Sequence, residues 1–179
     1  MNKQEGTHTC TEFTKELILI LILIFIPSSF VFLHRFIENG SRMIVYLTRR
    51  MRFNAAHKLW VADWSAEKNR AIFGKCSNRN WHGHNYELFV TVKGEPDPVT
   101  GFVMDAKALK DLVKKVITDK LDHSNLNLDV DFIPKGMQPT TENLAVLIWQ
   151  QLEPHLTECN LHCIRLHETE NISAAYYGE

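Results

Sequence analysis

The chain has few cysteines and no close pair of them. Only four occur among its 179 residues, and no two form a Cys-x-x-Cys pair. Small secreted domains are usually held together by a dense cysteine framework, so this low number favours a reducing compartment. We therefore expect a cytoplasmic protein.

An excess of charge of either sign is also missing. The 20 basic and 21 acidic side chains leave a net charge of −1, which gives no sign of binding to nucleic acid or to an anionic membrane surface. The sequence has neither an internal repeat nor a low-complexity tract. Its length suits one ordinary domain with a packed core, and we expect no nucleic-acid partner.

A hydrophobic run long enough to be a clear membrane span is missing as well. Residues 17–26 are all apolar, but the run continues to residue 33 only across a Pro-Ser-Ser break. A spanning helix needs about 20 predominantly apolar residues. The acidic residues in front of the run and the lack of a small-residue cleavage site are untypical of a signal peptide.

Three interpretations of residues 1–42 stay open. They lie outside the native protein because translation starts at Met43, they form a membrane anchor or an uncleaved signal, or they pack as part of the fold. We expect the main domain to occupy residues 43–179. A membrane is a partner only if the N-terminal extension belongs to the protein.

The hydrophobic pattern beyond Met43 predicts strands at both ends of the domain. Apolar residues alternate with polar ones there, which is typical of half-buried strands. The predicted strands lie at 45–53, 87–93, 102–104 and 163–177, the last with a turn near Glu170-Asn171.

Two helices are predicted between these strands. Apolar residues recur at helical spacing over 109–117, and Asp105 is placed to cap this helix. After a loop over 121–139 that is rich in Asp and Asn, Thr141 is expected to cap a second helix that ends near Pro154. The order strand, strand, helix, helix, strand, strand indicates an α+β fold with an antiparallel sheet.

The segment GKCSNRNWHGHNY, residues 74–86, contains the strongest functional signal. In an extended segment, residues two apart project from the same face, so His82 and His84 can point at one metal ion. Imidazole nitrogens suit zinc, and Gly83 removes a side chain that could obstruct the ion. A catalytic zinc site usually has three protein ligands and one open position, so a third ligand is needed.

His57 is the first candidate for that third ligand. It ends the first predicted strand, and a neighbouring strand could bring it beside the His-Gly-His segment. His155 and His162 are alternatives, but neither has an accompanying motif.

Cys76 precedes His82 by six positions, and its role stays open at this point. The thiol could be a fourth ligand of a closed structural site, a nucleophile or base, or an inert buried group. Lys75, Arg79 or the metal could lower its pKa, since nearby cations stabilise a thiolate.

Three further polar features are candidates for function. Asp122 next to His123 could fix the tautomer of the imidazole, although the loop could equally be solvated. Glu142 lies in the first turn of a predicted helix, where a carboxylate favours the helix dipole anyway. Glu168 lies in a predicted strand. If its side chain faces inward, the buried charge must be compensated by a partner, which suggests a functional role.

Taken together, these segments resemble the 6-pyruvoyl-tetrahydropterin synthase family, which includes the related 6-carboxy-tetrahydropterin synthases of queuosine biosynthesis. The resembling stretches run in order through nearly all of residues 43–179 and do not extend into residues 1–42. They are FNAAHKL (53–59), FGKCSNRNWHGHNYELFVTVKG (73–94), DPVTGFVMD (97–105), LDHSNLNLD (121–129), TTENLAV (140–146) and LHETENISAAYYG (166–178).

The resemblance implies a β-β-α-α-β-β fold, with a four-stranded antiparallel sheet and two helices on one face. It also implies that three copies close a barrel and two trimers stack, so that active sites form at subunit interfaces. The implied zinc ligands are His57, His82 and His84, and the implied catalytic base is Cys76. Asp122 and His123 would be its partners in proton transfer, Glu168 would anchor the pterin, and Thr141 and Glu142 would help to frame the pterin pocket.

The reaction implied by the resemblance is the zinc-dependent conversion of 7,8-dihydroneopterin triphosphate to 6-pyruvoyl- or 6-carboxy-tetrahydropterin, with release of triphosphate. The Cys76-x5-His82 spacing resembles that of the pyruvoyl-forming enzymes, but both products, and with them the biopterin and queuosine pathways, stay open. A zinc hydrolase and a non-catalytic zinc-stabilised module are the alternatives, and the lack of an HExxH helix weakens the first.

Overall fold

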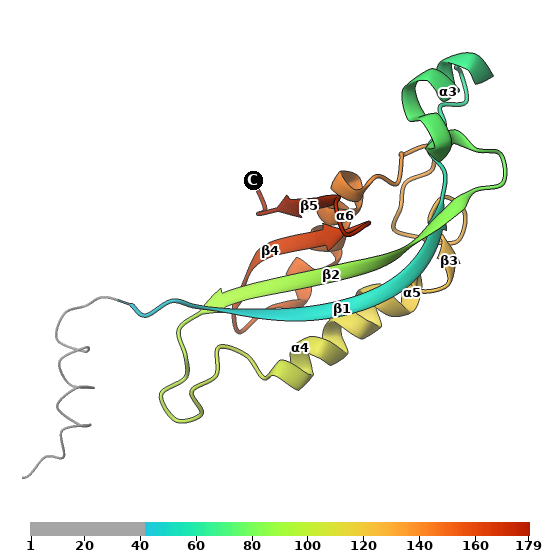
Figure 1. Ribbon diagram of the computed structural model, residues 1–179. Helices are drawn as coiled ribbons and strands as arrows, with labels where there is room; N and C mark the ends of the chain where they lie inside the picture. Colours follow the sequence, from blue (N-terminus) through green and yellow to red (C-terminus); the bar gives the residue numbers. More distant parts are fainter. Residues whose placement is uncertain (1–41) are drawn as a thin grey trace, which may run out of the picture. The chain divides into compact units, whose positions relative to one another are not determined.

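Five strands form one sheet in the computed structural model, which describes residues 42–179 (Figure 1). The three interpretations of the N-terminal extension fall on residues outside this range. The strand order is β3-β1-β2-β4-β5. The strands are β1 (Val45–His57), β2 (His82–Gly94), β3 (Ser124–Asn125), β4 (Asn160–His167) and β5 (Ser173–Tyr176).

β1 and β2 are the longest strands, with 13 residues each, and they pair antiparallel along their whole length. β4 pairs with β2 only over Glu87–Lys93, and β5 forms a hairpin with β4. Among the described residues, positions 82–86 of β2 therefore have no strand partner on the β4 side. This unpaired segment of β2 forms one wall of the cleft described below.

The sheet differs from the prediction in two strands. β3, unexpected, pairs parallel with Ala55 and Ala56 over two residues, which is too short a match for hydrophobic alternation to reveal. The predicted strand at 102–104 is wrong. The Phe102 carbonyl accepts a hydrogen bond from the Asp97 N–H, so this segment closes a turn instead of joining the sheet.

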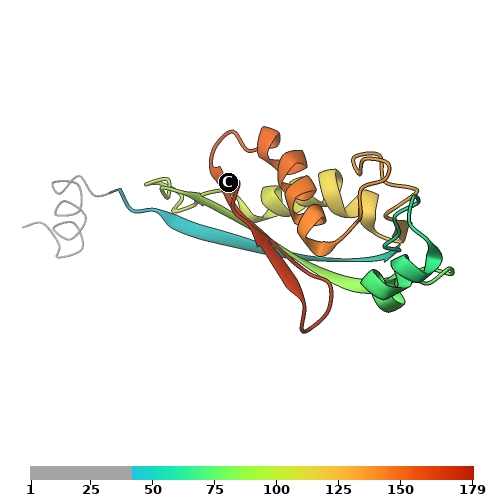
Figure 2. The same cartoon turned by 90° about the horizontal axis from the view of Figure 1, so that it is seen from above.

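Helices cover one face of the sheet (Figure 2). The first predicted helix is a continuous helical segment made of α4 (Ala106–Val113), the π-helical turn η2 (Lys114–Thr118) and α5 (Asp119–Leu121). The second is α6 (Thr141–Leu152), followed by the short 3-10 turn η3 (Glu153–His155). The α+β class and the two predicted helices are confirmed.

The core lies between the sheet and these helices, and it fixes which face of β2 points inward. Fully buried residues of this layer are Leu88, Val90 and Val92 of β2, Leu109, Val113 and Ile117 of the first helical segment, and Leu144 and Ile148 of α6. Burial of each such side chain contributes about 1.5–3 kcal/mol. Since alternate residues of a strand share a face, the same pattern directs His82 and His84 toward the helix side.

One of the two predicted helix caps is confirmed and the other is wrong. Asp105 caps α4, and its carboxylate accepts from the Ala108 N–H at 2.7 Å. The prediction of Thr141 as the cap of α6 is wrong, because Thr140 has the extended backbone of a cap and accepts from the Asn143 N–H. Thr141 is instead the first helical residue, and its hydroxyl is free for another contact.

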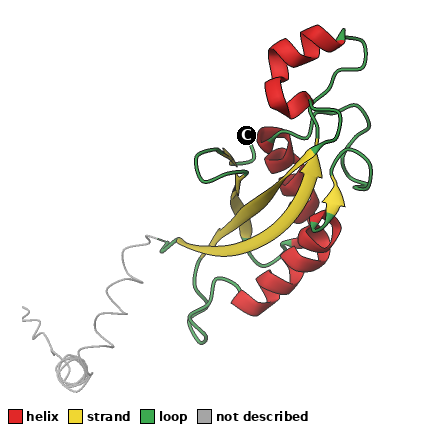
Figure 3. Ribbon diagram, turned by 45° about the vertical axis from the view of Figure 1, so that its right-hand side comes forward, coloured by secondary structure: helices red, strands yellow, loops and turns green. Residues whose placement is uncertain are grey.

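A third helix, α3 (Ala66–Phe73), and the 3-10 turn η1 (Gly74–Ser77) lie beyond the ends of β1 and β2 (Figures 1 and 3). No helix was predicted here, because Asn69 is the one buried residue of α3 and the helix therefore has no apolar stripe. Ser65 caps the helix, and the Asn69 amide binds the backbone of Val61, Trp64 and Ser65. Polar contacts thus hold the segment that leads to Cys76.

Within residues 42–179, none of the helices combines the length and the hydropathy that a bilayer crossing requires.

Candidate functional site

The register of β1 and β2 places three histidines at one end of the sheet. His57, the last residue of β1, pairs with His82, the first residue of β2, and Ala55 pairs with His84. Cross-strand partners share a face, so all three imidazoles project toward the helix side. The ring centre of His57 lies 4.5 Å from that of His82 and 5.1 Å from that of His84.

Glu168, from the turn after β4, joins the three histidines. The possible ligand atoms of the four side chains all lie within 4.8 Å of one another. His57 Nε2 is 3.0 Å from His82 Nε2 and 3.4 Å from Glu168 Oε1, and His84 Nε2 is 2.9 Å from the same oxygen. This group of four side chains, the histidine–carboxylate group, could hold a metal ion.

The geometry of the group suits a metal in a way that hydrogen bonding alone does not explain. Zinc binds nitrogen and oxygen at about 2.0–2.2 Å, so donors on one tetrahedral ion lie roughly 3.3 Å apart. His57 Nδ1 lies 2.9 Å from the Pro139 carbonyl, to which it donates, and this leaves the lone pair of Nε2 facing His82. His84 Nε2 is buried and makes no hydrogen bond within the described part of the chain.

Electrostatics keep two of the imidazoles neutral, as metal ligands must be. The pKa of His82 is lowered, mainly by burial and also by the neighbouring His57 and His84. Burial also lowers the pKa of His84, against the opposing effect of Glu168, and His57 lowers it further.

Glu168 is held ionised. The contact with the His57 imidazole lowers its pKa to about 2 despite partial burial, and a hydrogen bond from the Thr141 hydroxyl acts in the same direction. Thr141, with 3% of its surface exposed, thus lies against the carboxylate that was expected to anchor a pterin. The structure also places this carboxylate within reach of a metal, a second role that the sequence had not suggested.

Cys76 lies in η1, and its carbonyl accepts from the Leu59 N–H just beyond β1. The expectation that Lys75 and Arg79 lower its pKa is wrong for this structure. Burial raises the pKa of the thiol, and the Glu168 carboxylate raises it further. Without a cation in the histidine–carboxylate group, Cys76 is therefore a thiol at neutral pH.

Asp122 and His123 form a pair at the other side of β1. His123 Nδ1 lies 3.0 Å from an Asp122 carboxylate oxygen, and Asp122 Oδ1 accepts from the Asn54 N–H at 2.8 Å. The His123 side chain is 79% exposed. Within residues 42–179, the hydrogen bonds of this pair reach Asn54, Thr118 and one another, and none reaches Cys76.

Other sequence candidates lie outside the histidine–carboxylate group. Glu142 is exposed in the first turn of α6, His155 is exposed in η3, and His162 lies on β4.

The structural role of Gly83 differs from the expected one, which was to clear space for a metal ion. A Cβ at Gly83 would lie 3.1 Å from the Ala55 carbonyl oxygen, so glycine permits the close approach of β1 and β2.

Tyr86 is a candidate that sequence reasoning missed. Its side chain is 1% exposed, and its hydroxyl is buried without a hydrogen-bond partner in the described structure. The ring centre lies 5.7 Å from that of His84, and burial together with nearby Glu168 and Cys76 raises the pKa of the phenol. The alternation His82, His84, Tyr86 was the available signal, since it places the phenol on the same face of β2 as the two imidazoles.

A cleft of about 690 Å³ opens beside this group, at the part of β2 that β4 leaves unpaired. Its walls come from β1, β2 and the turn between β4 and β5. His84, Tyr86 and Glu168 line it, together with polar side chains such as Asn54 and Asn85. Its volume suits a small organic molecule with polar groups.

Comparison with known proteins gives consistent results. The chain is 43% identical to the human 6-pyruvoyl tetrahydrobiopterin synthase over 141 residues, covering 79% of this chain and 97% of that protein. It is 44% identical to the Dictyostelium discoideum synthase of the same name over 139 residues, covering 78% and 99%. A 6-carboxy-5,6,7,8-tetrahydropterin synthase from Rickettsia typhi is 29% identical over 146 residues, covering 72% and 96%.

Solved structures and the family pattern agree with these relatives. The structure of Caenorhabditis elegans 6-pyruvoyl tetrahydropterin synthase matches with a TM-score of 0.71 and 37% identity, covering 78% of this chain and 99% of that one. A sequence model of the family described as 6-pyruvoyl tetrahydropterin synthase matches residues 46–179. The resemblance seen in the motifs is confirmed, and the chain belongs to the 6-pyruvoyl tetrahydropterin synthase family.

Proposed function

We propose that this protein is a zinc-dependent tetrahydropterin synthase, a lyase that acts on 7,8-dihydroneopterin triphosphate and releases triphosphate. The observation that carries the proposal is the meeting of three histidines and a carboxylate near Cys76, with His84 and Glu168 lining a cleft, in a chain with synthase relatives above 40% identity. A hydrolase would need an acidic base beside a metal-bound water. Glu168, the one carboxylate of the group, already accepts from the Thr141 hydroxyl and lies 3.4 Å from His57 Nε2.

His57, His82 and His84 would hold the zinc ion in this proposal, and Glu168 would bind the amino and N–H groups of the pterin ring. Zinc bound here would act as a Lewis acid toward the hydroxyl groups of the substrate side chain. Glu168 is ionised at neutral pH, so it can accept hydrogen bonds from a pterin. The contact from Thr141 orients one oxygen of this carboxylate, and Glu142 adds negative charge at the start of the same helix.

Cys76 is proposed as the base that removes a proton from a side-chain carbon. Its raised pKa means that it needs a positive charge nearby to become a thiolate, and the proposed metal site supplies one. This requirement ties the activity of the base to the loading of the site. Cys76 is not among the described side chains whose ligand atoms meet within 4.8 Å, which argues against a closed structural site in which the thiol is a ligand. Asp122 and His123 would relay the proton, with the carboxylate fixing the imidazole by the 3.0 Å contact.

The pyruvoyl product is proposed over the carboxy product. The relatives at 43–44% identity are named 6-pyruvoyl tetrahydrobiopterin synthases, whereas the Rickettsia protein named for the carboxy product is 29% identical. The five residues between Cys76 and His82 favour the same product.

Oligomerisation is part of the proposal. Outside the two residues paired with β3, β1 has an unpaired outer edge within the described chain, and β5 forms the opposite edge. Open edges are templates for strand pairing between copies, and closure into a barrel removes them. Asp122 and His123 lie exposed at the β1 edge, so a neighbouring copy could receive them in its own cleft.

The test is to incubate the full-length protein with 7,8-dihydroneopterin triphosphate, with zinc and after removal of zinc by a chelator. We expect zinc-dependent release of triphosphate and a product with the mass of 6-pyruvoyl-tetrahydropterin. Cys76→Ala should abolish the reaction, while Lys107→Ala, an exposed change on α4, should leave it unchanged. Acetaldehyde release would instead establish the carboxy product, and no triphosphate release by zinc-loaded protein would refute the synthase proposal.

A further inference from the structure

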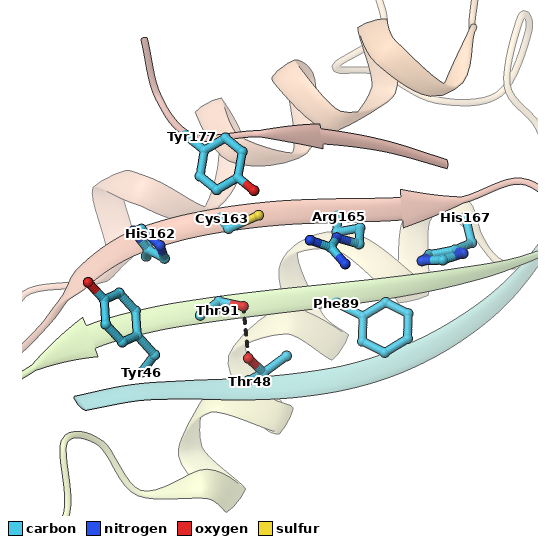
Figure 4. Close-up of a pocket in the computed structure, with 9 residues that line it drawn as sticks. All are labelled: Tyr46, Thr48, Phe89, Thr91, His162, Cys163, Arg165, His167 and Tyr177. Carbon is cyan, nitrogen blue, oxygen red and sulfur yellow. Dashed lines mark hydrogen bonds between the residues drawn. The ribbon is translucent and has the colours of Figure 1, made fainter. Parts of the chain in front are cut away.

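A second hollow, of about 400 Å³, lies on the open face of the sheet, opposite the helices (Figure 4). Side chains of β1, β2 and β4 line it, together with Tyr177 just after β5. No member of the histidine–carboxylate group lines this hollow, because alternate residues of a strand point to opposite faces. The hollow therefore lies outside the histidine–carboxylate group, and His167 is the one lining residue that it shares with the cleft beside that group.

The lining is rich in groups that can donate hydrogen bonds to an anion. It includes the guanidinium of Arg165 and the imidazoles of His162 and His167, and none of its nine residues is Asp or Glu. Figure 4 shows Arg165 between the two histidines along β4, with the Tyr177 hydroxyl turned toward the same space. An anion placed here would meet donors on several sides and no carboxylate.

Arg165 is distinguished from the other arginines of this face. Arg50 and Arg52 both form ion pairs with Glu87, and Arg50 also lies over the Phe89 ring. The side chain of Arg165 is exposed, and its guanidinium has no hydrogen bond or ion pair to another residue of the described chain. Because Glu87 is already shared by two guanidinium groups, the positive charge of Arg165 stays uncompensated on this face.

Aromatic contacts hold the two imidazoles in place around this charge. The ring centre of His162 lies 4.5 Å from that of Tyr46 and 5.7 Å from that of Tyr177. The ring of His167 lies 5.3 Å from that of Phe89. Side chains that are held in this way lose less conformational entropy when a ligand binds.

Thr48 and Thr91 form the floor between β1 and β2. Their hydroxyls are hydrogen-bonded to each other at 2.9 Å, which leaves one of the two protons free to reach a ligand. Hydroxyls, imidazoles and a planar guanidinium together make the donor set that proteins use for phosphate groups.

We propose that this hollow is a binding site for a phosphate-type oxyanion, with Arg165 as its main donor. The guanidinium would bind two oxygens of the anion at once, and the imidazoles and hydroxyls around it would bind the others. The site does not depend on the proposed catalytic activity, since none of its residues belongs to the proposed catalytic or metal-binding set.

The test is isothermal titration of inorganic triphosphate into the full-length protein, as purified and again after treatment with a chelator. We expect binding in both states, because the site needs no metal, and weaker binding at high salt. Arg165→Gln should weaken it by about tenfold or more, the usual effect of losing hydrogen bonds to a charged group. Lys107→Gln removes one positive charge from the helix side of the sheet and should change nothing.

Two further arms keep the proposal falsifiable. Arg165→Lys preserves the charge but not the planar fork, so it should bind less tightly than the wild type; circular dichroism checks that each variant is folded. Citrate, an anion without phosphate, should bind more weakly than triphosphate. Equal binding of triphosphate by the wild type and Arg165→Gln, or binding only in the metal-loaded protein, would overturn the proposal.

Discussion

The hydrogen bond between His57 Nδ1 and the Pro139 carbonyl decides which nitrogen of that imidazole faces the metal site. Because Nδ1 donates to the carbonyl, Nε2 carries the lone pair toward His82 and Glu168. Such contacts behind a metal ligand fix its tautomer and orientation. At the scale of single residues, the site is thus prepared for a cation before one binds.

The pH dependence expected for the proposed zinc site follows from the lowered pKa values of His82 and His84. A histidine with a lowered pKa stays neutral to a lower pH than the ordinary value of about 6.5. We therefore expect the protein to keep its zinc at pH 6.5 and to lose it as the pH falls through the lowered values. Zinc analysis by atomic absorption after dialysis between pH 8 and pH 4.5 measures this, and half-loss above pH 6.5 would contradict it.

A second prediction at the scale of single residues concerns Tyr86. Its buried hydroxyl has no partner in the described chain, so its removal should not destabilise the zinc-free fold. If the hydroxyl binds the substrate in the cleft, Tyr86→Phe should lower the rate of triphosphate release by roughly tenfold, the effect of one lost hydrogen bond. Thermal unfolding and steady-state kinetics test both parts. An unchanged rate would exclude the phenol from substrate binding.

At the scale of elements, two side-chain amides take the place of a neighbouring strand beyond the end of β1. The Asn127 amide accepts from Lys58 N and donates to Lys58 O, and the Gln138 amide does the same with Trp60. These reciprocal pairs fasten the loop over 121–139 to the chain that follows His57. The loop in turn supplies the Pro139 carbonyl that holds His57.

Gln138→Ala should therefore affect both stability and metal binding. Loss of its two bonds to Trp60 should lower the free energy of unfolding by about 1–2 kcal/mol. It should also weaken zinc binding, because Pro139 is the adjacent residue. Chemical denaturation and competition with a zinc chelator measure the two effects.

Asp105→Ala is the matched control for this change. It removes the cap of α4 and should cost about 1 kcal/mol of stability. Because α4 supplies no residue of the histidine–carboxylate group, zinc affinity should not change. Equal loss of zinc affinity in both variants would show that the effect of Gln138 is general destabilisation.

At the scale of the whole molecule, the separation of Asp122–His123 from Cys76 predicts sharing of the active site between copies. Cys76→Ala and His123→Ala should each be inactive, since each lacks one proposed catalytic group. When the two variants are unfolded, mixed in equal amounts and refolded, about a quarter of the wild-type activity should return. This fraction follows if each site takes Cys76 from one copy and His123 from its neighbour.

Refolding each variant by itself is the control for this experiment and should restore no activity. A mixture that stays inactive while forming oligomers, as judged by light scattering, would show that both groups act within one chain. A variant that fails to refold would be detected by circular dichroism before mixing.

Much of the site could be predicted from the sequence because its residues occur in short patterns. The alternation of His82 and His84 with buried positions indicated a shared strand face, and His57 at a strand end indicated where the third imidazole would come from. Asp105 was identified as a cap because its effect is local. Thr140 and Thr141 were confused because both can cap, and only the backbone angles separate them.

Other features depended on contacts between distant segments and could not be predicted. α3 has no apolar stripe, and β3 is two residues long, so neither leaves a periodic signal. The position of Glu168 among the histidines depends on where β4 ends against β2, which no local pattern encodes.

The sequence by itself determined the α+β class, the family and the three histidines, because strand alternation, helical spacing and motif order are properties of neighbouring residues. Only the tertiary structure decided that Glu168 joins the histidines, that Cys76 has a raised pKa and that Asp122–His123 makes no hydrogen bond to Cys76 within the described residues. It also decided that the Arg165 guanidinium lies on the open face without a partner among residues 42–179. The physical reason is that burial, charge and hydrogen bonding depend on which distant segments come together.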